Sequence, residues 1–292
     1  MPQSLRTLKS RIRTAKNIAQ LAKTLEMVSV AKIRRARGLA ETVRPYAERI
    51  TSLGDTALRS VAPGEFVHPY LGPRPGAPAG ASDGGRLLLV IGPDKGLCGP
   101  LVSNLVRKMF EEDSPDSQLI TVGKRMGTPA ARVAGSRLVA SFPIGSRLPE
   151  YSLVYDLVLA INGLILAAKA TRLDVLYTRF VSYFTQVPTL DHVLPLVPEP
   201  ALGEPESQRP HAIEPDLSGL LEALLPHYLE VRLFDAVIQA YSSEHGARMV
   251  AMQNAKKNAL EIADSFTLLY NKTRQERITN EILDLANTGK SA

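Results

Sequence analysis

The glycine-rich stretch Gly92–Gly99 (GPDKGLCG) is the part of this sequence whose residue types come nearest to ligand chemistry. It follows a short apolar run and precedes a helical pattern, which is where loops that bind nucleotide phosphates occur. A G-x-x-x-x-G-K-[ST] loop needs a lysine and a hydroxyl after its last glycine, but Pro100 and Leu101 stand there. The stretch does not fit G-x-G-x-x-G either. We interpret its glycines as residues of a tight turn, with Asp94 and Lys95 as candidate exposed contact residues.

The other residues that do chemistry in proteins form no catalytic or metal-binding pattern. Ser242–His245 places hydroxyl, carboxylate and imidazole groups side by side, but adjacent residues on a helix point in different directions. Cys98 is the single cysteine, so it excludes an internal disulfide and a multi-cysteine metal site and favours a reducing compartment. The five histidines lack metal-ligand spacing: they are His68, His192, His211, His227 and His245. We therefore expect no catalytic residue, no bound metal and no cofactor.

The positive charge of the chain is concentrated at its N-terminal end. The whole chain carries a formal net charge of +6, yet Glu26 is the sole acid within residues 1–40. The basic residues of this segment are Arg6, Lys9, Arg11, Arg13, Lys16, Lys23, Lys32, Arg34, Arg35 and Arg37. Such a segment is expected to meet an acidic partner. Nucleic acid is one alternative, but no aromatic residue for base stacking precedes Tyr46, and the charges surround the helix instead of forming one face.

The elements at both ends of the chain are predicted to be long helices. Residues 4–58 follow a helical repeat, in which Pro45 is expected to kink or end the helix before it resumes. The apolar and small residues of its stripe are Leu5, Leu8, Ile12, Ala15, Ala19 and Ala22. Residues 216–287 repeat the pattern, with Pro226 expected to kink the first turns. Its seam is His245, Arg248, Met252, Ala255, Ala259, Ile262, Phe266, Leu269 and Thr273.

The middle of the chain alternates short strands with helices. Strands are predicted at 86–91, 118–122, 137–142, 174–182 and 193–197, and helices at 101–112 and 153–170. This alternation favours a parallel α/β unit, flanked by loops at 62–85 and 198–215 that are rich in proline. No apolar run approaches the ~20 residues that a membrane-spanning helix needs.

The predicted fold class is therefore α/β with long helices: an antiparallel coiled coil of the N- and C-terminal helices, plus an inserted Rossmann-like α/β domain. Small residues on both stripes allow the two helices to approach closely. We divide the sequence into an N-terminal long helix (1–60), an α/β domain with flanking loops (61–215) and a C-terminal long helix (216–292).

Several stretches resemble the gamma subunits of bacterial F-type ATP synthases. Thr24–Ala36 (TLEMVSVAKIRRA) resembles the N-terminal signature of that family. Ser243–Ala255 (SEHGARMVAMQNA), followed by Tyr270–Ile282 (YNKTRQERITNEI), resembles the C-terminal signature. Asp94–Gly99 and Gln186–Thr189 are also similar to the family. These stretches are distributed over nearly the whole chain, and their order and spacing make the resemblance specific.

The resemblance implies a rotor without catalysis of its own. The paired helices would stand as a shaft inside a ring of three alpha and three beta subunits, and the α/β domain would be a foot that binds the epsilon subunit and the ring of c subunits (the c-ring). Ion flow would turn the shaft, whose asymmetry would take each beta site through binding, synthesis and release. The chain would be peripheral, on the cytoplasmic face of the bacterial plasma membrane. Nucleic acid is not an expected partner in this interpretation.

The resemblance also implies particular contact residues. Those expected to meet the beta subunit, through an acidic lever loop, are Lys23, Leu25, Met27, Lys32, Arg34, Arg35, Lys95, Arg248, Arg274, Gln275 and Thr279. An apolar tip is expected to turn in a bearing, and it comprises Ile278, Ile282, Leu283 and Leu285. A bearing should be apolar because directional hydrogen bonds would hold the rotor in one position. For each of these residues, coiled-coil packing or solvation is the alternative.

Five positions depart from the family pattern. Lys95 stands where arginine is usual, which keeps the charge but loses the planar fork. Pro100 replaces glycine, Asn280 replaces glutamine, Leu25 replaces a commoner methionine, and Pro226 falls in a helix that is normally uninterrupted. The alternatives that remain open are a nucleotide-binding enzyme built on the α/β unit and a basic coiled-coil scaffold that binds nucleic acid.

Overall fold

The computed structural model describes residues 4–61, 66–72, 85–145, 147–167, 170–196 and 216–288, with side chains to residue 283. The chain divides into two compact units. We call Met1–Val30 with Arg248–Ala292 the helical unit, and Ala31–Ala247 the α/β unit. The elements in order are α1 (Leu5–Arg59), η1 (Pro69–Leu71), β1 (Arg86–Ile91), α2 (Leu101–Glu112), β2 (Gln118–Val122), α3 (Lys124–Ala134), η3 (Gly135–Arg137), β3 (Leu138–Phe142), α4 (Tyr151–Leu166), β4 (Arg172–Phe180), β5 (Gln186–Leu194) and α5 (Leu217–Thr288).

A five-stranded sheet in the order β3-β2-β1-β4-β5 organises the α/β unit. Its first four strands are parallel, and β5 runs antiparallel to β4. The central strand β1 is apolar from Leu87 to Ile91, and all of these side chains are fully buried. A strand that is apolar throughout must be covered on both faces, and the unit has helices on both sides of the sheet.

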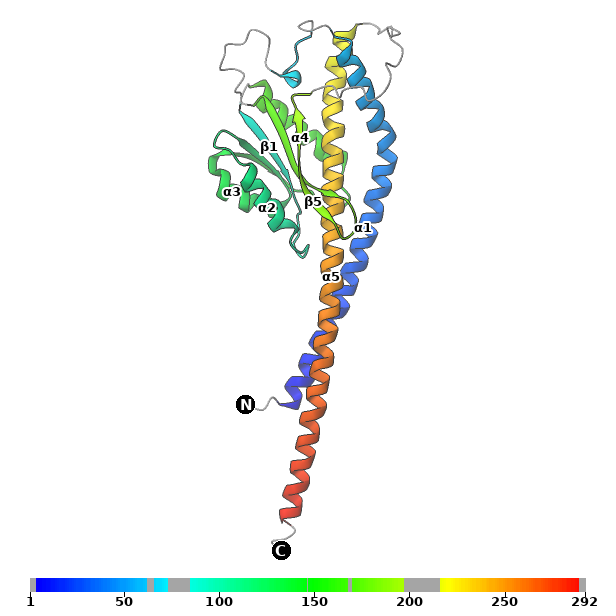
Figure 1. Cartoon of the computed structure of the whole chain (residues 1–292), viewed down its shortest axis with the longest axis vertical. Helices are drawn as coiled ribbons and strands as arrows, with labels where there is room; N and C mark the ends of the chain where they lie inside the picture. Colours follow the sequence, from blue (N-terminus) through cyan, green and yellow to red (C-terminus); the bar gives the residue numbers. More distant parts are fainter. Residues whose placement is uncertain are drawn as a thin grey trace. The chain divides into compact units, whose positions relative to one another are not determined.

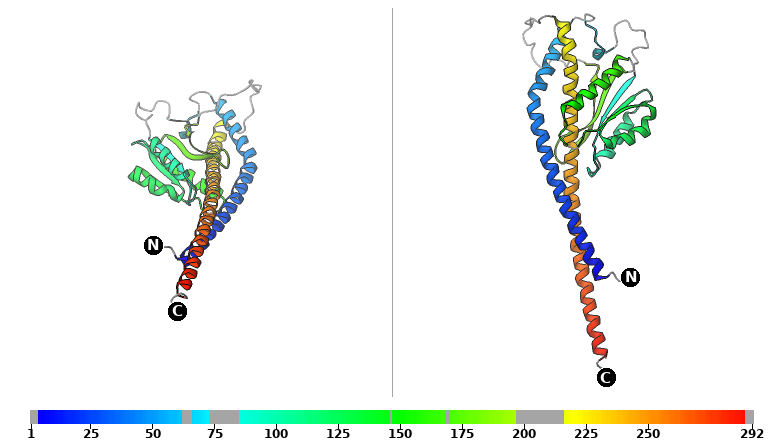
Figure 2. Two further views of the ribbon diagram at one scale, coloured as in Figure 1. Left: turned by 60° about the horizontal axis from the view of Figure 1, so that its bottom comes forward. Right: turned by 180° about the vertical axis from the view of Figure 1, so that it is seen from behind.

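The two faces of the sheet have separate cores. Leu88 and Val90 of β1 face α2 and α3, where they meet Leu105 and Met126. The alternate β1 residues face α4 and α5. Together with side chains of these two helices, such as Ile161 of α4, they form the larger core. Figures 1 and 2 show α2 and α3 on one side of the sheet and α4 on the other. The result is a three-layer α/β arrangement.

The terminal helices contribute to both units and run antiparallel in each. In the α/β unit, Gly54 of α1 lies against Tyr228 of α5, and Lys32 lies over the ring of Tyr241 at 6.0 Å. In the helical unit, Glu26 pairs with Lys256 at 3.3 Å and Arg11 lies over the ring of Phe266 at 5.5 Å. The predicted stripe of small residues is buried there, because Ala15, Ala19 and Ala22 are each at most 6% exposed. The predicted fold class is confirmed.

Gly123 makes the tight connection between β2 and α3 possible. Its φ is +100°, a conformation that disfavours residues with a Cβ atom. A Cβ atom at this position would lie 2.0 Å from the carbonyl oxygen of Gly92, at the end of β1. The backbones after β1 and β2 therefore approach each other more closely than any side chain permits.

The elements differ in detail from those predicted. Of the two outcomes expected at Pro45, an end of the helix is excluded, because α1 continues through it; a proline leaves one carbonyl of the preceding turn without its partner, and water can bond it on this exposed stretch. The last strand is β5 (Gln186–Leu194), not 193–197, and it forms a hairpin with β4, so the sheet is mixed. Helix α3 was not predicted, because Gly127 and Pro129 obscure its buried Met126-Ala130-Ala134 repeat.

Candidate functional site

The loop after β1 lies at the carboxyl edge of the parallel strands and is organised by Asp94. The Asp94 carboxylate accepts hydrogen bonds from the backbone N–H groups of Lys124 (2.9 Å), Ile144 (3.1 Å) and Gly145 (2.8 Å). These donors follow β2 and β3, so one carboxylate connects three loops. Asp94 therefore has a structural role that its position in a glycine-rich loop did not reveal, while Lys95 beside it is exposed.

Helix α5 occupies the end of β4, where open parallel sheets bind nucleotides. Ser243 Oγ donates to the carbonyl of Thr178 at 2.8 Å, and Gln239 Oε1 accepts from the N–H of Phe180 at 3.2 Å. Gly246 permits this approach, because a Cβ atom there would lie 3.1 Å from the Phe180 ring. The chain's own helix thus satisfies the strand end that a nucleotide would otherwise approach, which agrees with the missing phosphate-loop residues.

The residues that resemble a triad are part of the packing. Ser242 to His245 are all at most 5% exposed, and Ser243 uses its hydroxyl to bond the β4 backbone. The His245 ring makes an edge contact with Tyr241 at 4.5 Å. Cys98 is also buried, with its thiol 3.8 Å from the carbonyl of Lys95. Within the described residues, no group of three His, Cys, Asp or Glu side chains has the geometry of a metal site.

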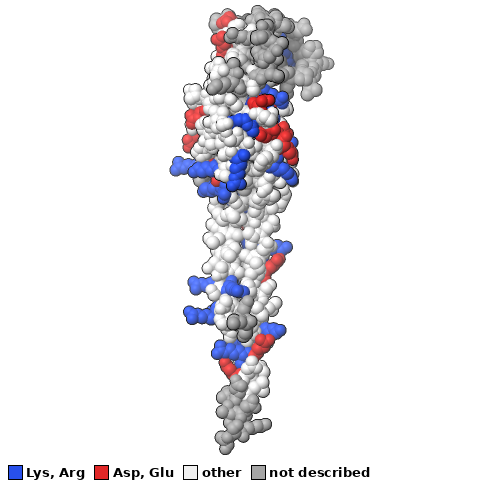
Figure 3. Space-filling model, turned by 90° about the vertical axis from the view of Figure 1, so that its left-hand side faces the viewer, with Lys and Arg blue, Asp and Glu red and all other residues white. Residues whose placement is uncertain are grey.

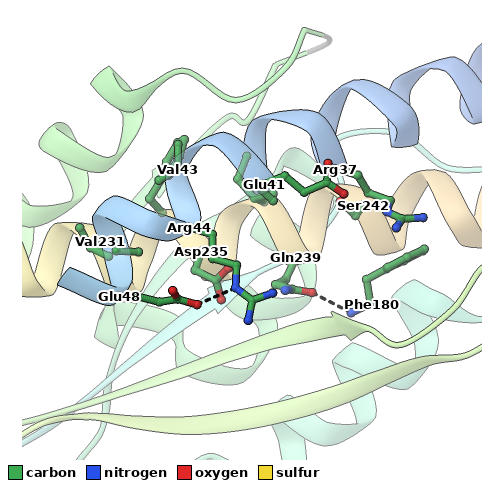
Figure 4. A pocket seen from close by; sticks show the side chains of 14 residues that line it. Arg37, Glu41, Val43, Arg44, Glu48, Phe180, Val231, Asp235, Gln239 and Ser242 are labelled. Carbon is green, nitrogen blue, oxygen red and sulfur yellow. Dashed lines mark hydrogen bonds and ion pairs between the residues drawn. The ribbon is translucent and has the colours of Figure 1, made fainter. Parts of the chain in front are cut away.

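A cleft of about 390 Å³ lies between α1 and α5 in the α/β unit (Figure 4). Its apolar floor includes Val231 and Phe234 of α5. Charged side chains line its rim, and Arg44 pairs there with Glu48 at 2.7 Å. The rim residues drawn from α1 and α5 are Arg37, Glu41, Arg44, Glu48 and Asp235. Opposite charges around an apolar floor are typical of a contact surface between proteins, and the lining holds no nucleophile paired with a base.

Tyr177 of β4 should make the α/β unit less stable as the pH rises in the alkaline range. Burial, together with its hydrogen bond to Asp191 at 2.8 Å, raises the pKa of Tyr177 from 10.0 to about 12. Between these values the folded chain keeps a proton that the unfolded chain loses. We therefore expect the Tyr177 contribution to be intact below pH 10 and to fall by about 1.4 kcal/mol per pH unit up to pH 12.

Urea unfolding of the full chain and of Tyr177→Phe, compared at several pH values between 9 and 12, measures this contribution. The pH slope of the unfolding free energy should be shallower in the variant. Equal slopes in the two proteins would show that Tyr177 does not carry the alkaline loss of stability.

The predicted contact residues of α1 are placed on its surface, with one exception. Lys23, Leu25, Met27, Arg34 and Arg35 are exposed, whereas Lys32 is half-buried over Tyr241. Figure 3 shows that Lys and Arg side chains of the viewed face are interrupted by Asp and Glu side chains and by uncharged surface. A continuous basic field of the kind that tracks a nucleic acid backbone is not seen on that face.

The predicted contact residues of α5 differ in burial. Arg248 is 7% exposed, so it packs within the chain. From Arg274 to Leu283 every side chain is exposed, including Gln275 and Thr279. Ile278, Ile282 and Leu283 of the predicted tip are 44%, 60% and 54% exposed, while the side chain of Leu285 lies outside the described residues.

Sequence reasoning missed a further set of exposed apolar side chains in the helical unit. They alternate with the buried stripe of α1 and are Ile18, Leu21, Val28 and Val30, and α5 adds Leu260, Ile262, Leu268 and Leu269. Exposed apolar side chains in such number on two paired helices are consistent with an interaction site. The signal was present in the sequence, because α1 carries apolar residues at more positions than one packed stripe needs.

Among the helices of the described residues, none combines the length and apolarity needed to cross a bilayer.

A family model described as ATP synthase matches residues 4–292. The chain is 37% identical over 290 residues to the ATP synthase gamma chain of Dehalococcoides mccartyi, covering 97% of this chain and 96% of that one. It is also 37% identical over 296 residues to the ATP synthase gamma chain of Roseiflexus castenholzii, with the same shares covered.

Solved structures show the same fold. A chain in the cryo-EM structure of the Euglena gracilis mitochondrial ATP synthase (OSCP/F1/c-ring) has a TM-score of 0.71 and 19% identity, covering 98% of this chain and 94% of that one. A chain from the central stalk/c-ring structure of the Tetrahymena thermophila mitochondrial ATP synthase has a TM-score of 0.58 and 18% identity, covering 80% of this chain and 99% of that one. Taken with the match over residues 4–292, these comparisons establish that the chain belongs to the ATP synthase gamma chain family.

Proposed function

We propose that this protein is the central rotor shaft of an F-type ATP synthase, and that it couples transmembrane ion flow to ATP synthesis or hydrolysis in the alpha/beta catalytic head. The observation that carries this proposal is the family match over residues 4–292. Helices of 55 and 72 residues at the two ends of the chain support it. The protein acts without chemistry of its own, as a subunit of the complex.

Coupling of this kind is a free energy shared between sites and not a reaction step. A shaft with different surfaces on its sides stabilises a different conformation in each neighbouring catalytic site. The helical unit has such surfaces: α1 is basic, and both helices expose apolar side chains such as Leu21 and Leu268. Turning the shaft exchanges which neighbour meets which surface, so each site passes through the sequence of conformations in turn.

The proposed contacts with the beta subunit are of three kinds: charged, hydrogen-bonding and apolar. Lys23, Arg34 and Arg35 offer exposed positive charges to an acidic lever loop, and Lys95 offers one from the α/β unit. Arg274, Gln275 and Thr279 offer hydrogen bonds from the α5 segment where every side chain is exposed. Leu25 and Met27 add apolar contact. Arg248 and Lys32 are more buried and position the helices on which the exposed residues stand.

The end of α5 is proposed as the apolar tip that turns in a bearing formed by its neighbours. The pairs Glu26–Lys256 and Arg11–Phe266 set the antiparallel register, and this register brings the start of α1 near residue 272 of α5. Beyond it α5 continues without α1, as Figure 1 shows within the helical unit. Apolar side chains on a single exposed helix can slide against an apolar collar, because dispersion contacts have no preferred direction.

The α/β unit is proposed as the foot that binds the epsilon subunit and the c-ring, and α4 supports this role. One side of α4 is buried, but Tyr155, Leu159 and Leu166 on its other side are 60%, 64% and 74% exposed. A helix that is apolar all round is normally covered on all sides. We therefore place a partner on this stripe. From its family, we place the protein on the cytoplasmic face of the bacterial plasma membrane.

Leu159→Glu tests the partner surface on α4. We expect the variant chain to fold normally, because Leu159 is mostly exposed, but to lose about tenfold or more in affinity for the foot partners, since a buried unpaired charge costs several kcal/mol. Recovery of epsilon and c subunits with the tagged chain measures the effect. Thr128→Glu on exposed α3 is the control. If both variants retain these subunits equally, the α4 stripe is not the foot interface.

Affinity purification of the tagged chain from its native membranes tests the function as a whole. Recovery of alpha and beta subunits in equal amounts, each in excess over the chain and with ATPase activity, supports the rotor assignment. Recovery of the chain with nucleic acid instead, in a salt-dependent complex, would support the basic-scaffold alternative. The family assignment favours the first outcome.

A further inference from the structure

A small pocket in the α/β unit is built from three elements that meet at the carboxyl ends of the strands. The start of α2, the β4–β5 hairpin and α5 enclose a volume of about 260 Å³. The lining residues used below are Leu101, Asn104, Thr178, Gln186, Pro188 and Ala247. Strand β1, which α2 follows, lies between β2 and β4 in the sheet, so the pocket sits at a change of strand order, where α/β sheets bind ligands.

A buried hydroxyl in this pocket has no partner. Thr178 is 3% exposed, and its Oγ1 has no hydrogen-bond partner among the described residues. Ser243 bonds the Thr178 backbone carbonyl, so it leaves the hydroxyl unsatisfied. A buried polar group without a hydrogen bond is rare and costly in native proteins. Because Thr178 lines the pocket, a molecule bound there can supply the missing hydrogen bond.

Other polar groups of the lining are suited to an uncharged ligand. The Gln186 amide donates through Nε2 to the carbonyls of Ser182 (3.1 Å) and Tyr183 (2.8 Å), which fixes its orientation and leaves its oxygen as an acceptor. Asn104 adds both a donor and an acceptor. The lining includes no Asp, Glu, Lys or Arg side chain. A charged ligand would therefore be desolvated without a counter-charge, which is unfavourable.

Apolar groups form the remaining walls. Leu101 and Ala247 are buried, and Pro188 stands on β5 opposite Thr178. The volume is below the ~300–1,000 Å³ of sites for drug-sized ligands, so the occupant is a single ring or a molecule of similar size. The positive end of α2 lies beside the pocket and favours an oxygen acceptor on the ligand.

We propose that this pocket is a binding site for a small uncharged ring that carries an amide edge, of the kind found in pyrimidine bases. Its N–H donates to Thr178 or the Gln186 oxygen, its carbonyl accepts from Thr178 or Asn104, and its faces contact Leu101 and Pro188. The inference does not depend on the rotor function.

Uracil is the probe for this site, and N1,N3-dimethyluracil, which has no N–H donor, is its matched control. Saturable binding of uracil to the full chain, measured by calorimetry and by chemical shifts of pocket residues, is the expected result. Dimethyluracil should bind at least tenfold more weakly. Thr178→Val should weaken uracil binding about tenfold and also raise the melting temperature of the free chain, because the unsatisfied hydroxyl is gone. Thr189→Val, on β5 outside the pocket lining, should leave uracil binding unchanged.

Three results would overturn the proposal. The first is no saturable binding of uracil up to its solubility limit. The second is equal binding of uracil by the chain and by Thr178→Val. The third is a high-resolution structure in which an ordered water bonds Thr178 and stays in place with uracil present. Binding of inorganic phosphate but not of uracil would likewise reject the uncharged ligand and indicate an anion site at the start of α2.

Discussion

Gly123→Ala will lower the free energy of unfolding of the α/β unit by about 3 kcal/mol or more. The new methyl group would lie 2.0 Å from the carbonyl oxygen of Gly92, and φ at this position is +100°. Backbone strain of this kind costs of order 1–3 kcal/mol, and the overlap with a second backbone segment adds to it. The loop cannot move freely to relieve the overlap, because Asp94 ties it to the N–H groups of Lys124 and Ile144.

Gly145→Ala separates the two contributions. Gly145 also has a positive φ, +89°, but a Cβ atom there would meet no atom within 4 Å. It should therefore show the conformational cost alone, about 1 kcal/mol. Urea unfolding followed by amide exchange in β1 and β2 measures both variants. If Gly123→Ala loses no more stability than Gly145→Ala, the close approach of the β1 and β2 ends is not as the structure describes.

Arg274→Ala combined with Gln275→Ala is expected to reduce ion-driven ATP synthesis about tenfold while leaving assembly intact. Both side chains are exposed in the chain, so their removal changes its own stability by less than about 0.5 kcal/mol. In the complex, a hydrogen bond from a charged donor contributes about 1.5–3 kcal/mol. Loss of about 1.4 kcal/mol of coupling corresponds to a tenfold change.

Asn271→Ala combined with Lys272→Ala is the matched control, since it removes an amide and a positive charge from exposed positions of the same helix. ATP synthesis in membrane vesicles under an imposed ion gradient, compared with ATP hydrolysis by the same vesicles, reports coupling. Unchanged synthesis in the Arg274/Gln275 variant, or an equal loss in the control, would contradict the contact that we propose for these residues.

The sequence was most informative where packing alone sets the structure. The repeat of Ala15, Ala19 and Ala22 predicted a buried stripe, and the structure confirms it. On α5 the predicted seam is buried at Met252 and Ala259, but the next buried residue is Ala263, while Ile262 is 50% exposed. A helix of 3.6 residues per turn drifts relative to a 3.5-residue seam, so a strict heptad pattern loses register along a long helix.

Contacts between distant segments were beyond the reach of the sequence. Nothing local distinguishes Asp94 from a solvated loop aspartate, because its partners Lys124, Ile144 and Gly145 come together only through the sheet order. The hairpin that makes β5 antiparallel was missed for a related reason. Pro188 interrupts the strand pattern in the sequence, but β5 is an edge strand, where a missing N–H is tolerated.

The candidate site was predictable in part. The missing phosphate-loop residues after Gly99 correctly predicted that the glycine-rich loop serves a turn. They did not show that Ser243 and Gln239 of α5 bond the end of β4. Burial also separated residues that the family resemblance placed together: Arg274 is exposed, whereas Arg248 is packed within the chain. A sequence motif carries the residue type but not its accessibility.

Rotation of the chain inside its assembled complex tests the central claim most directly. Cys98 is 2% exposed, so a cysteine placed at the exposed Arg107 of α2 can be labelled selectively and attached to a bead. With the alpha and beta subunits fixed to a surface, the rotor account predicts that the bead turns in one direction when ATP is added and stops when ATP is exhausted. ATP hydrolysis by the assembled complex while the bead stays at a fixed angle would contradict it.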